Sequence, residues 1–376
     1  HEFYNLTDYE NWKKQREDKN VLGKWDIKYY KGLGTSTSSE AKEYFSNMTR
    51  NVINMKWEDG KSSASIIKAF SKAHVKDRKQ WLLEHQEKPE SILYNDNSMT
   101  FSDFIDKEFI SYSKADNIRS IPSMLDGLKP SQRKVLYGAF KRNLINEVKV
   151  SQLAGYVSEN AAYHHGEVSL TNTIVSMAQK FVGTNNINLL YPSGQFGTRL
   201  MGGKDAASSR YIFTKLNNIS RLIFHPEDDC LLHYLDEDGQ SIEPQFYVPI
   251  IPMILVNGAV GIGSGWSTFI PQYNPIDIIE IIEKKMKADN HDNKECLIPY
   301  FDGFKGIIEE TENNSCIIKS NLVSFDKERF ELRIHELPVG TWTQQYKLFL
   351  ESDQMKHIVK SIKENHSDTD IDFIIK

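Results

Sequence analysis

A tyrosine that directly follows an arginine, Arg210-Tyr211, is the pair in this sequence with the clearest capacity for chemistry. A phenol has a pKa of ~10, below that of an aliphatic hydroxyl, so a phenolate is both a usable nucleophile and a usable leaving group. A phosphodiester transferred to tyrosine can therefore be transferred back without ATP. Arginine stays protonated and its planar guanidinium fits phosphate oxygens, so Arg210 can stabilise charge that develops on phosphorus. Without further context, such a pair is usually a surface tyrosine beside a surface arginine.

The context is a glycine-rich segment, Gly194 to Tyr211, that reads GQFGTRLMGGKDAASSRY. Its Gly-Gly-Lys run at 202–204 is not a P-loop, because Thr198 replaces the first glycine and Asp205 replaces the Ser or Thr that meets Mg²⁺. The glycines at 261–265 also lack the spacing of a dinucleotide fingerprint. These runs predict no nucleotide site.

Four ordered blocks resemble DNA topoisomerase II of the eukaryotic type. They are the glycine-rich segment and, before it, YYKGLGTS at 29–36, IPSMLDGLKPSQRKVL at 121–136 and AYHHGE at 162–167. The resemblance covers essentially the whole chain. It implies an enzyme that passes one duplex through a transient double-strand break held by 5′-phosphotyrosyl links, and so relaxes supercoils and decatenates DNA.

The resemblance also implies a role for individual residues. Tyr211 is expected to be the nucleophile, with Arg210 and His165 as the other catalytic residues. Asp126 is expected to orient a cation, and Ile262 to enter the duplex as an apolar wedge that bends it. The residues expected at the DNA are Arg78, Lys79, Arg119, Asp126, Lys129, Arg133, Tyr163, Ser169, Ile262 and Trp342.

Taken without the resemblance, several of these residues have ordinary explanations. Adjacent histidines such as His164 and His165 point apart and have no third ligand at a suitable spacing, which favours buried hydrogen-bonded histidines over a metal site. The basic residues at 78–79 and 119–133 read as solvated helix faces. Ile262 lies between glycines that let a backbone approach a ligand closely, or it is a buried residue in a turn.

Two positions depart from the family pattern. Val260 stands where relatives carry an acidic residue, and Gly340 replaces a basic residue beside Trp342. These departures concern local contacts and not the chemistry of Tyr211.

The elements that must position these residues follow from hydrophobic periodicity. Pro130 marks a helix start, and Val135, Leu136, Ala139 and Phe140 form its inward stripe. Further helices are expected at 150–158 and at 167–181, followed by strand-like pieces. Periodicity alone leaves a winged helix-turn-helix and an ordinary helical subdomain equally open, and the resemblance favours the winged helix.

The expected fold is α+β and multidomain: a C-terminal piece of a Toprim fold, a winged helix-turn-helix (CAP-like) domain and a mixed α/β tower domain. The expected boundaries are 1–95 for the Toprim end and linker, 96–265 for the winged-helix domain and 266–376 for the tower, which stops before a coiled-coil gate. The expected elements are a capped helix start before Glu40, helices at 64–83, 276–286 and 343–350, strands at 306–309, 316–320 and 330–334, and a linker at 84–96.

Composition supports a folded protein with a confined anionic ligand. The 376 residues are 39% hydrophobic and 26% charged, with a net charge of −5. From Arg119 to Tyr211, eleven Lys and Arg face five Asp and Glu, which gives +6 there and −11 elsewhere. Three cysteines predict neither a disulfide framework nor a zinc site, and favour a reducing compartment. The apolar run at 247–262 is too short and too interrupted to span a bilayer.

Cofactors and partners are expectations from the resemblance. It implies Mg²⁺ held by Toprim carboxylates upstream of residue 1, ATP bound elsewhere in the full enzyme, double-stranded DNA, a homodimer and the nucleus. The chain by itself is expected to bind DNA but to cleave it poorly. Two alternatives remain: a non-enzymatic winged-helix DNA-binding module, and a tyrosine transesterase such as a site-specific recombinase.

Overall fold

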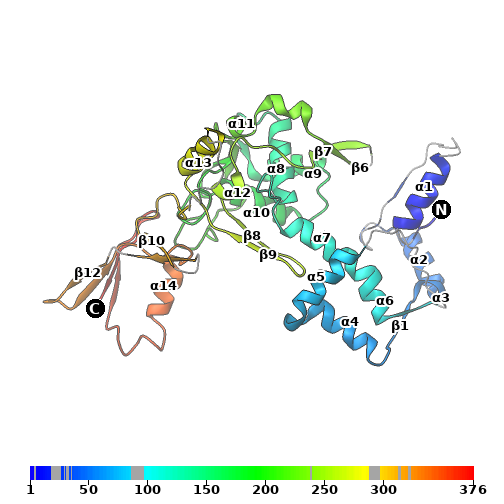
Figure 1. Cartoon of the computed structure of the whole chain (residues 1–376), viewed down its shortest axis with the longest axis horizontal. Coiled ribbons are helices and arrows are strands. Elements are labelled where there is room, and N and C mark those ends of the chain that lie inside the picture. The colour runs from blue at the N-terminus through cyan, green and yellow to red at the C-terminus, as the bar shows by residue number, and fades with distance from the viewer. Residues whose placement is uncertain are drawn as a thin grey trace. The chain divides into compact units, whose positions relative to one another are not determined.

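The computed structural model describes residues 1–3, 6–17, 27–28, 30, 34, 36–85, 97–237, 239–287, 297–311, 315–320 and 323–376. These residues form two compact units, His1–Asn117 with Gly263–Trp266, and Ile118–Ile262 with Ser267–Lys376 (Figure 1). Most of the predicted block at 29–36, most of the predicted linker at 84–96, and Cys296 lie outside the described residues.

The first unit is mainly helical. The predicted helix start before Glu40 is confirmed, because Glu40 N donates to Thr37 Oγ1 at 3.3 Å while Thr37 N donates to the Glu40 carboxylate at 2.6 Å. Besides the helices, this unit contains two short strands that pair in parallel. The elements are α1 (Leu6–Glu17), α2 (Ser38–Ser46), α3 (Met48–Asn51), β1 (Asn54–Lys56), α4 (Lys61–Phe70), η2 (Lys72–His74), α5 (Val75–Glu84), β2 (Ser98–Thr100), α6 (Phe101–Asp103), η4 (Phe104–Phe109) and α7 (Ile110–Ser120).

The single helix predicted at 64–83 is wrong, because the structure divides it into α4, η2 and α5. Ser71 leaves the helix with extended backbone (φ −71°, ψ 136°), and its Oγ accepts a bond from Ala73 N at 3.3 Å. Arg78 donates to the carbonyls of Lys68 and Ser71 at 3.1 and 2.7 Å. A serine that caps the next turn competes with the helix ladder, which periodicity does not register.

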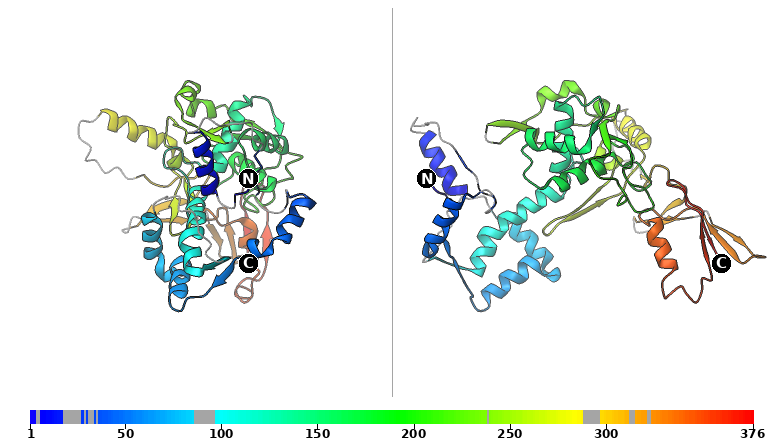
Figure 2. Two further views of the ribbon diagram at one scale, coloured as in Figure 1. Left: turned by 90° about the vertical axis from the view of Figure 1, so that its right-hand side faces the viewer. Right: turned by 180° about the vertical axis from the view of Figure 1, so that it is seen from behind.

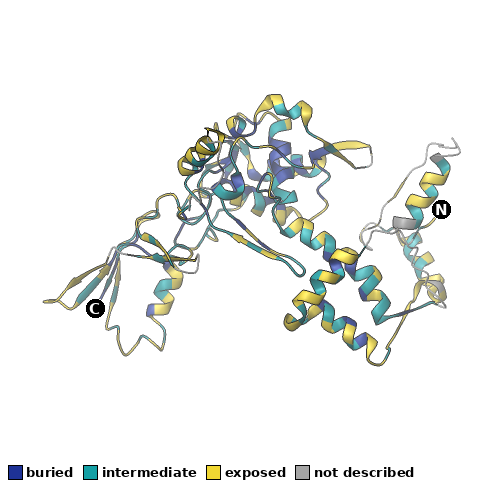
Figure 3. Ribbon diagram, viewed as in Figure 1, coloured by how far each residue is buried: buried dark blue, intermediate teal, exposed yellow. Residues whose placement is uncertain are grey.

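Three helices of the second unit pack against one another around a dark-blue core in Figure 3: α8 (Pro130–Lys141), α9 (Val150–Asn160) and α10 (Glu167–Ala178). Pro130 begins α8 as predicted, and the stripe residues Val135, Leu136 and Ala139 are fully buried. α10 ends before the predicted 181, because Gln179 turns out of the helix. A sheet of order β3 (Val148–Lys149), β5 (Phe213–Leu216), β4 (Leu190–Ser193) adjoins them, which confirms the winged helix-turn-helix.

Two hairpins extend this domain. In the first, β6 (Tyr234–Glu237) pairs with β7 (Gln240–Pro244), and β7 packs against α8. In the second, β8 (Ala259–Ile262) pairs with β9 (Ser267–Ile270), so that Val260 lies opposite Phe269 and Ile262 opposite Ser267. Two short helical turns precede the first hairpin, α11 (Ser220–Ile223) and η5 (Pro226–Leu231), and α12 (Met253–Val256) lies between the hairpins.

The C-terminal part is mixed α/β, as predicted. The helices α13 (Pro275–Lys287) and α14 (Thr343–Leu350) and the strands β10 (Ile307–Glu310), β11 (Cys316–Lys319) and β13 (Glu331–Ile334) match the predicted ranges closely. Three strands escaped prediction: β12 (Val323–Asp326), β14 (Ile362–Glu364) and β15 (Phe373–Ile375). They are short, and pairing in the order β12-β13-β15-β14 holds them, with α14 beside the sheet (Figure 2).

The compact units divide at Asn117/Ile118 and not at the predicted 95/96. Residues after 96 join the first unit through contacts such as the Lys68–Asp106 ion pair at 2.6 Å. Near the predicted 265/266, the division sets apart only Gly263–Trp266, which join the first unit, and the residues on both sides of this tip belong to the second unit. Within the second unit, buried Arg199 of the glycine-rich segment pairs with Glu336 and donates to Leu337 O at 2.7 Å. These contacts join the C-terminal part to the winged-helix domain in one unit.

Candidate active site

The glycine-rich segment folds as a compact loop because its glycines adopt conformations closed to other residues. Gly197 has φ +94°, and a Cβ there would lie 2.5 Å from Gly203 Cα. Asp205 accepts a bond from Thr198 N at 2.9 Å and another from the Thr198 hydroxyl. Gln179, just after α10, donates to Phe196 O at 2.9 Å. The loop is thus fixed to itself and to the end of a core helix.

This loop presents Tyr211 outward. Tyr211 is 73% exposed, whereas the next residue, Ile212, is buried in the core. The first turn of α9 holds the backbone on both sides of Arg210-Tyr211. Ser151 N donates to Ser209 O at 3.1 Å, and Val150 N donates to Ile212 O at 3.0 Å. An exposed phenol on an anchored backbone can reach a backbone phosphate without rearrangement of the core.

Arg210 accompanies Tyr211 on the surface. Its guanidinium carbon lies 5.9 Å from the centroid of the Tyr211 ring, and the side chain is exposed. A charge so placed can meet the oxygens of a phosphate that approaches the phenol.

The AYHHGE block lies at the start of α10. Tyr163 is buried and its hydroxyl donates to Ser169 Oγ at 3.2 Å, so the two residues expected at DNA contact each other. The His165 ring packs edge-on against the Tyr163 ring, with 5.4 Å between centroids. Among the described residues, no hydrogen bond, ion pair or ring contact joins His165 to Arg210 or Tyr211.

The expectation of buried histidines is wrong. His164 and His165 are both exposed, and they point to different partners. His164 Nε2 lies 2.5 Å from Glu237 Oε1 on the β6–β7 hairpin, while His165 is exposed beside Tyr163. Of the two, His165 is the one that can meet a ligand.

Asp126 orients a cation as expected, and that cation is Arg133. Its fully buried carboxylate accepts two bonds from Arg133, from Nε at 2.7 Å and Nη2 at 3.0 Å. The same carboxylate accepts bonds from the backbone N–H groups of Leu128 and Tyr247, each at 3.0 Å. Arg133 is itself buried and also donates to Leu128 O at 3.0 Å. This geometry favours a role for Arg133 in shaping the 121–133 turn over direct contact with phosphate.

The remaining expected DNA residues differ in exposure. Arg119 is exposed and Lys129 half-buried in the second unit. In the first unit, Lys79 Nζ lies 5.8 Å from the Trp266 ring centroid, and Arg78 holds the Ser71 break. Their contacts with DNA stay predictions.

Trp342 is half-buried because it packs on glycines. A Cβ on Gly202 would clash with its indole, and Gly183 and the Phe181 ring lie against it as well. This packing ties the glycine-rich loop to the residue before α14, and it explains why glycine occupies position 202.

Ile262 is 79% exposed, which contradicts the alternative of a buried turn residue. The glycine before it serves a different purpose from the one expected. A Cβ on Gly261 would clash with the Ser120 carbonyl, so this glycine lets β8 approach the chain at 120–122 and not a ligand.

The sequence pattern of the DNA gyrase/topoisomerase IV family, in its A-type subunits, matches residues 119–376. The chain belongs to this family. The pattern described as the C-terminal associated domain of TOPRIM matches residues 1–117.

Relatives of this family member resemble it along its whole length. It is 49% identical to DNA topoisomerase 2 of Drosophila melanogaster over 99% of the chain and 26% of that protein. It is 48% identical to DNA topoisomerase 2-alpha of Homo sapiens over 100% of the chain and 25% of that protein. The chain therefore spans about a quarter of the length of these curated relatives.

A solved structure is similar in fold as well. The Plasmodium falciparum topoisomerase II DNA-binding, cleavage and re-ligation domain matches with a TM-score of 0.79 and 47% identity. The match covers all of this chain and 50% of the other.

The described residues of this family member offer no ready metal site. They include no group of three or more His, Cys, Asp or Glu side chains that could hold a metal ion. The resemblance places the expected Mg²⁺ ligands outside this chain. No described helix is long and apolar enough to cross a membrane.

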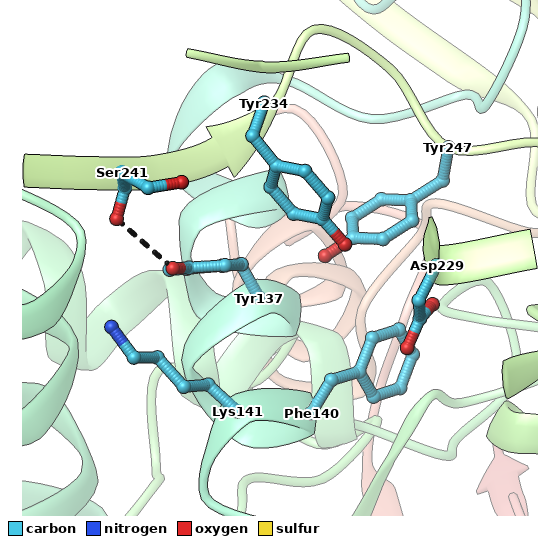
Figure 4. A pocket seen from close by; sticks show the side chains of 7 residues that line it. All are labelled: Tyr137, Phe140, Lys141, Asp229, Tyr234, Ser241 and Tyr247. Carbon is cyan, nitrogen blue, oxygen red and sulfur yellow. Dashed lines mark hydrogen bonds between the residues drawn. The ribbon is translucent and has the colours of Figure 1, made fainter. Parts of the chain in front are cut away.

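A cavity of about 310 Å³ lies beside α8, and its lining does not include Tyr211. Figure 4 shows its lining, which includes the rings of Tyr137, Tyr234 and Tyr247. Burial raises the pKa of the Tyr247 phenol, and the Tyr137 hydroxyl donates to Ser241 O at 3.1 Å. These rings pack the domain, whereas the ring of Tyr211 is exposed.

Sequence reasoning missed the residues that hold the site in shape. Gln179, Arg199 and Asp205 fix the glycine-rich loop. From the sequence alone, Gln179 is only a helix residue, Arg199 only a charge and Asp205 only a mismatch to a P-loop. One available signal was the density of glycines, since a loop with so many positive-φ positions needs side-chain anchors.

Proposed function

We propose that this chain is the DNA-binding and cleavage core of a eukaryotic-type DNA topoisomerase II. The parent enzyme passes one duplex through a transient double-strand break in another, and this relaxes supercoils and separates linked chromosomes. One observation carries the proposal: in a member of this family, an exposed Tyr211 stands beside exposed Arg210 on a backbone anchored to α9.

In the proposed reaction, the Tyr211 oxygen forms a bond to phosphorus as the bond from phosphorus to the 3′-oxygen breaks. The Tyr211 phenol gives up its proton in this step, the 3′-oxygen leaves and takes up a proton to become a hydroxyl, and a 5′-phosphotyrosyl link remains. Attack by that hydroxyl on the link reverses the step and rejoins the strand. Arg210 stabilises the developing charge and His165 helps to position the phosphate.

The proposal extends to the partners of the whole enzyme. Double-stranded DNA is the substrate, and a two-fold homodimer supplies two tyrosines so that both strands are cut. Mg²⁺ and ATP are bound by parts of the enzyme outside this chain, and the enzyme acts in the nucleus. The similarity to the named DNA topoisomerase 2 proteins supports these statements.

The test is covalent trapping with the longer protein that contains this chain. Supercoiled DNA and Mg²⁺ are added, then detergent and protease, and linear DNA is scored for wild type and Tyr211→Phe. Tyr191→Phe is the matched control, because Tyr191 is also exposed and has the Lys215 ammonium 5.3 Å from its ring. We expect linear DNA from wild type and Tyr191→Phe and none from Tyr211→Phe. Equal product from all three would leave only a DNA-binding module.

A further inference from the structure

One face of the β8–β9 hairpin is exposed and apolar. Val260, Ile262 and Phe269 are 57, 79 and 78% exposed. The other face is anchored, because Ala259 and Gly261 are buried and Gly261 lies against the Ser120 carbonyl. The exposed face is therefore held in a fixed orientation by the rest of its own unit.

The strand register makes these side chains contiguous. Val260 lies directly opposite Phe269, and Ile262 opposite Ser267. Residues two apart on a strand share a face, so the Val260–Phe269 pair lies directly behind Ile262 on the same surface. Phenylalanine is, like isoleucine, one of the residue types that enter the minor groove as wedges.

The surroundings of this face identify the occupant as DNA. Arg119, an exposed cation of the same unit, directly precedes Ser120, whose carbonyl packs on Gly261. An apolar ridge suits a minor groove, where sugars and bases offer apolar surface, and exposed Arg119, in the segment that packs on the opposite face of the hairpin, adds positive charge for the phosphates at the groove edges. A hairpin is also narrow enough to enter a groove.

Building on the proposed function, we infer that Val260 and Phe269 form the base of the wedge and contact the minor groove next to the step opened by Ile262. Their side chains cover the sugar and base edges exposed by unstacking and set how deeply Ile262 inserts. The pair thus adds to the affinity for bent DNA and to the size of the bend.

The test measures binding by fluorescence anisotropy and bending by energy transfer between the ends of a short labelled duplex, at one fixed salt concentration. The variants of the full chain are V260T/F269S, Ile262→Ala, and the matched control V323T/F325S. Val323 and Phe325 are likewise exposed on a strand, β12, of the same unit. All substitutions are at the surface, and thermal melts check that each variant folds.

We expect V260T/F269S to weaken binding roughly tenfold and to reduce the bend, because two apolar side chains lose their burial against DNA. The control should bind and bend as wild type does. If Ile262→Ala loses bending while V260T/F269S keeps wild-type affinity and bend, the pair is not part of the wedge and the proposed function stands. If wild type itself does not bend DNA, both this inference and the expectation that Ile262 bends the duplex fail, while strand cleavage by Tyr211 is tested separately by covalent trapping. A changed sedimentation of V260T/F269S with unchanged DNA binding would instead assign the face to contact between copies.

Discussion

Arg133 and Arg210 are cations of the same unit with opposite surroundings. Arg133 is buried, and Asp126 and the Leu128 carbonyl take up its donors. Arg210 is exposed and faces a phenol 5.9 Å away. Both lie in blocks expected to meet DNA, yet only Arg210 has its charge presented to a ligand. The difference separates residues that build the site from residues that act in it.

The largest effect should come from a break in the buried pair. Asp126→Asn leaves the Arg133 guanidinium buried beside a neutral amide, and removal of one partner of a buried ion pair costs about 3–5 kcal/mol. Urea unfolding of the second unit measures the change. The control is Asp353→Asn, whose carboxylate is 92% exposed and lies 2.5 Å from Lys356 Nζ, and where we expect about 0–1 kcal/mol. Equal losses at the two positions would mean that Arg133 is not held as the structure describes.

A smaller effect on stability and a large one on chemistry are expected for Arg210→Gln. Because the side chain is exposed, the free energy of unfolding should change by no more than about 0.5 kcal/mol. Strand cleavage should slow by roughly 10²–10³, since a preorganised charge at the phosphate is lost. Arg142→Gln is matched, because exposed Arg142 lies 5.1 Å from the Tyr156 ring, and it should leave cleavage unchanged. A large loss of stability in Arg210→Gln would remove the distinction between the two arginines.

The sequence predicts features that depend on neighbouring residues better than features that depend on distant partners. Hydrophobic periodicity predicted the start and the buried stripe of α8, because both depend on local pattern, whereas the winged helix was favoured only through the resemblance that the ordered motifs carry. The resemblance places Arg133 and Trp342 at DNA, and those contacts stay predictions. It did not indicate that Arg133 is the cation paired with Asp126 or that Trp342 packs on Gly202. Partners such as Glu336 for Arg199 lie more than a hundred residues away, and no local pattern encodes them. For the same reason β14 and β15, which exist only through pairing, escaped prediction.

The smallest expected effect concerns the half-buried carboxylate of Glu40, the counterpart of fully buried Asp126. Hydrogen bonds from the Tyr30 hydroxyl, the Thr37 backbone N–H and the Lys28 ammonium lower the pKa of Glu40 from 4.5 to about 2. A lowered pKa in the folded state means that Glu40 contributes stability above pH 4.5, and that this contribution disappears as the pH falls towards 2. The difference in unfolding free energy between wild type and Glu40→Gln should therefore be small and constant near neutral pH and shrink across that window. Since the Glu40 side chain is still 28% exposed, added salt should also reduce this difference, whereas the Asp126→Asn loss should persist in salt because that pair is buried. A difference that grows on acidification would contradict the bonds described for Glu40.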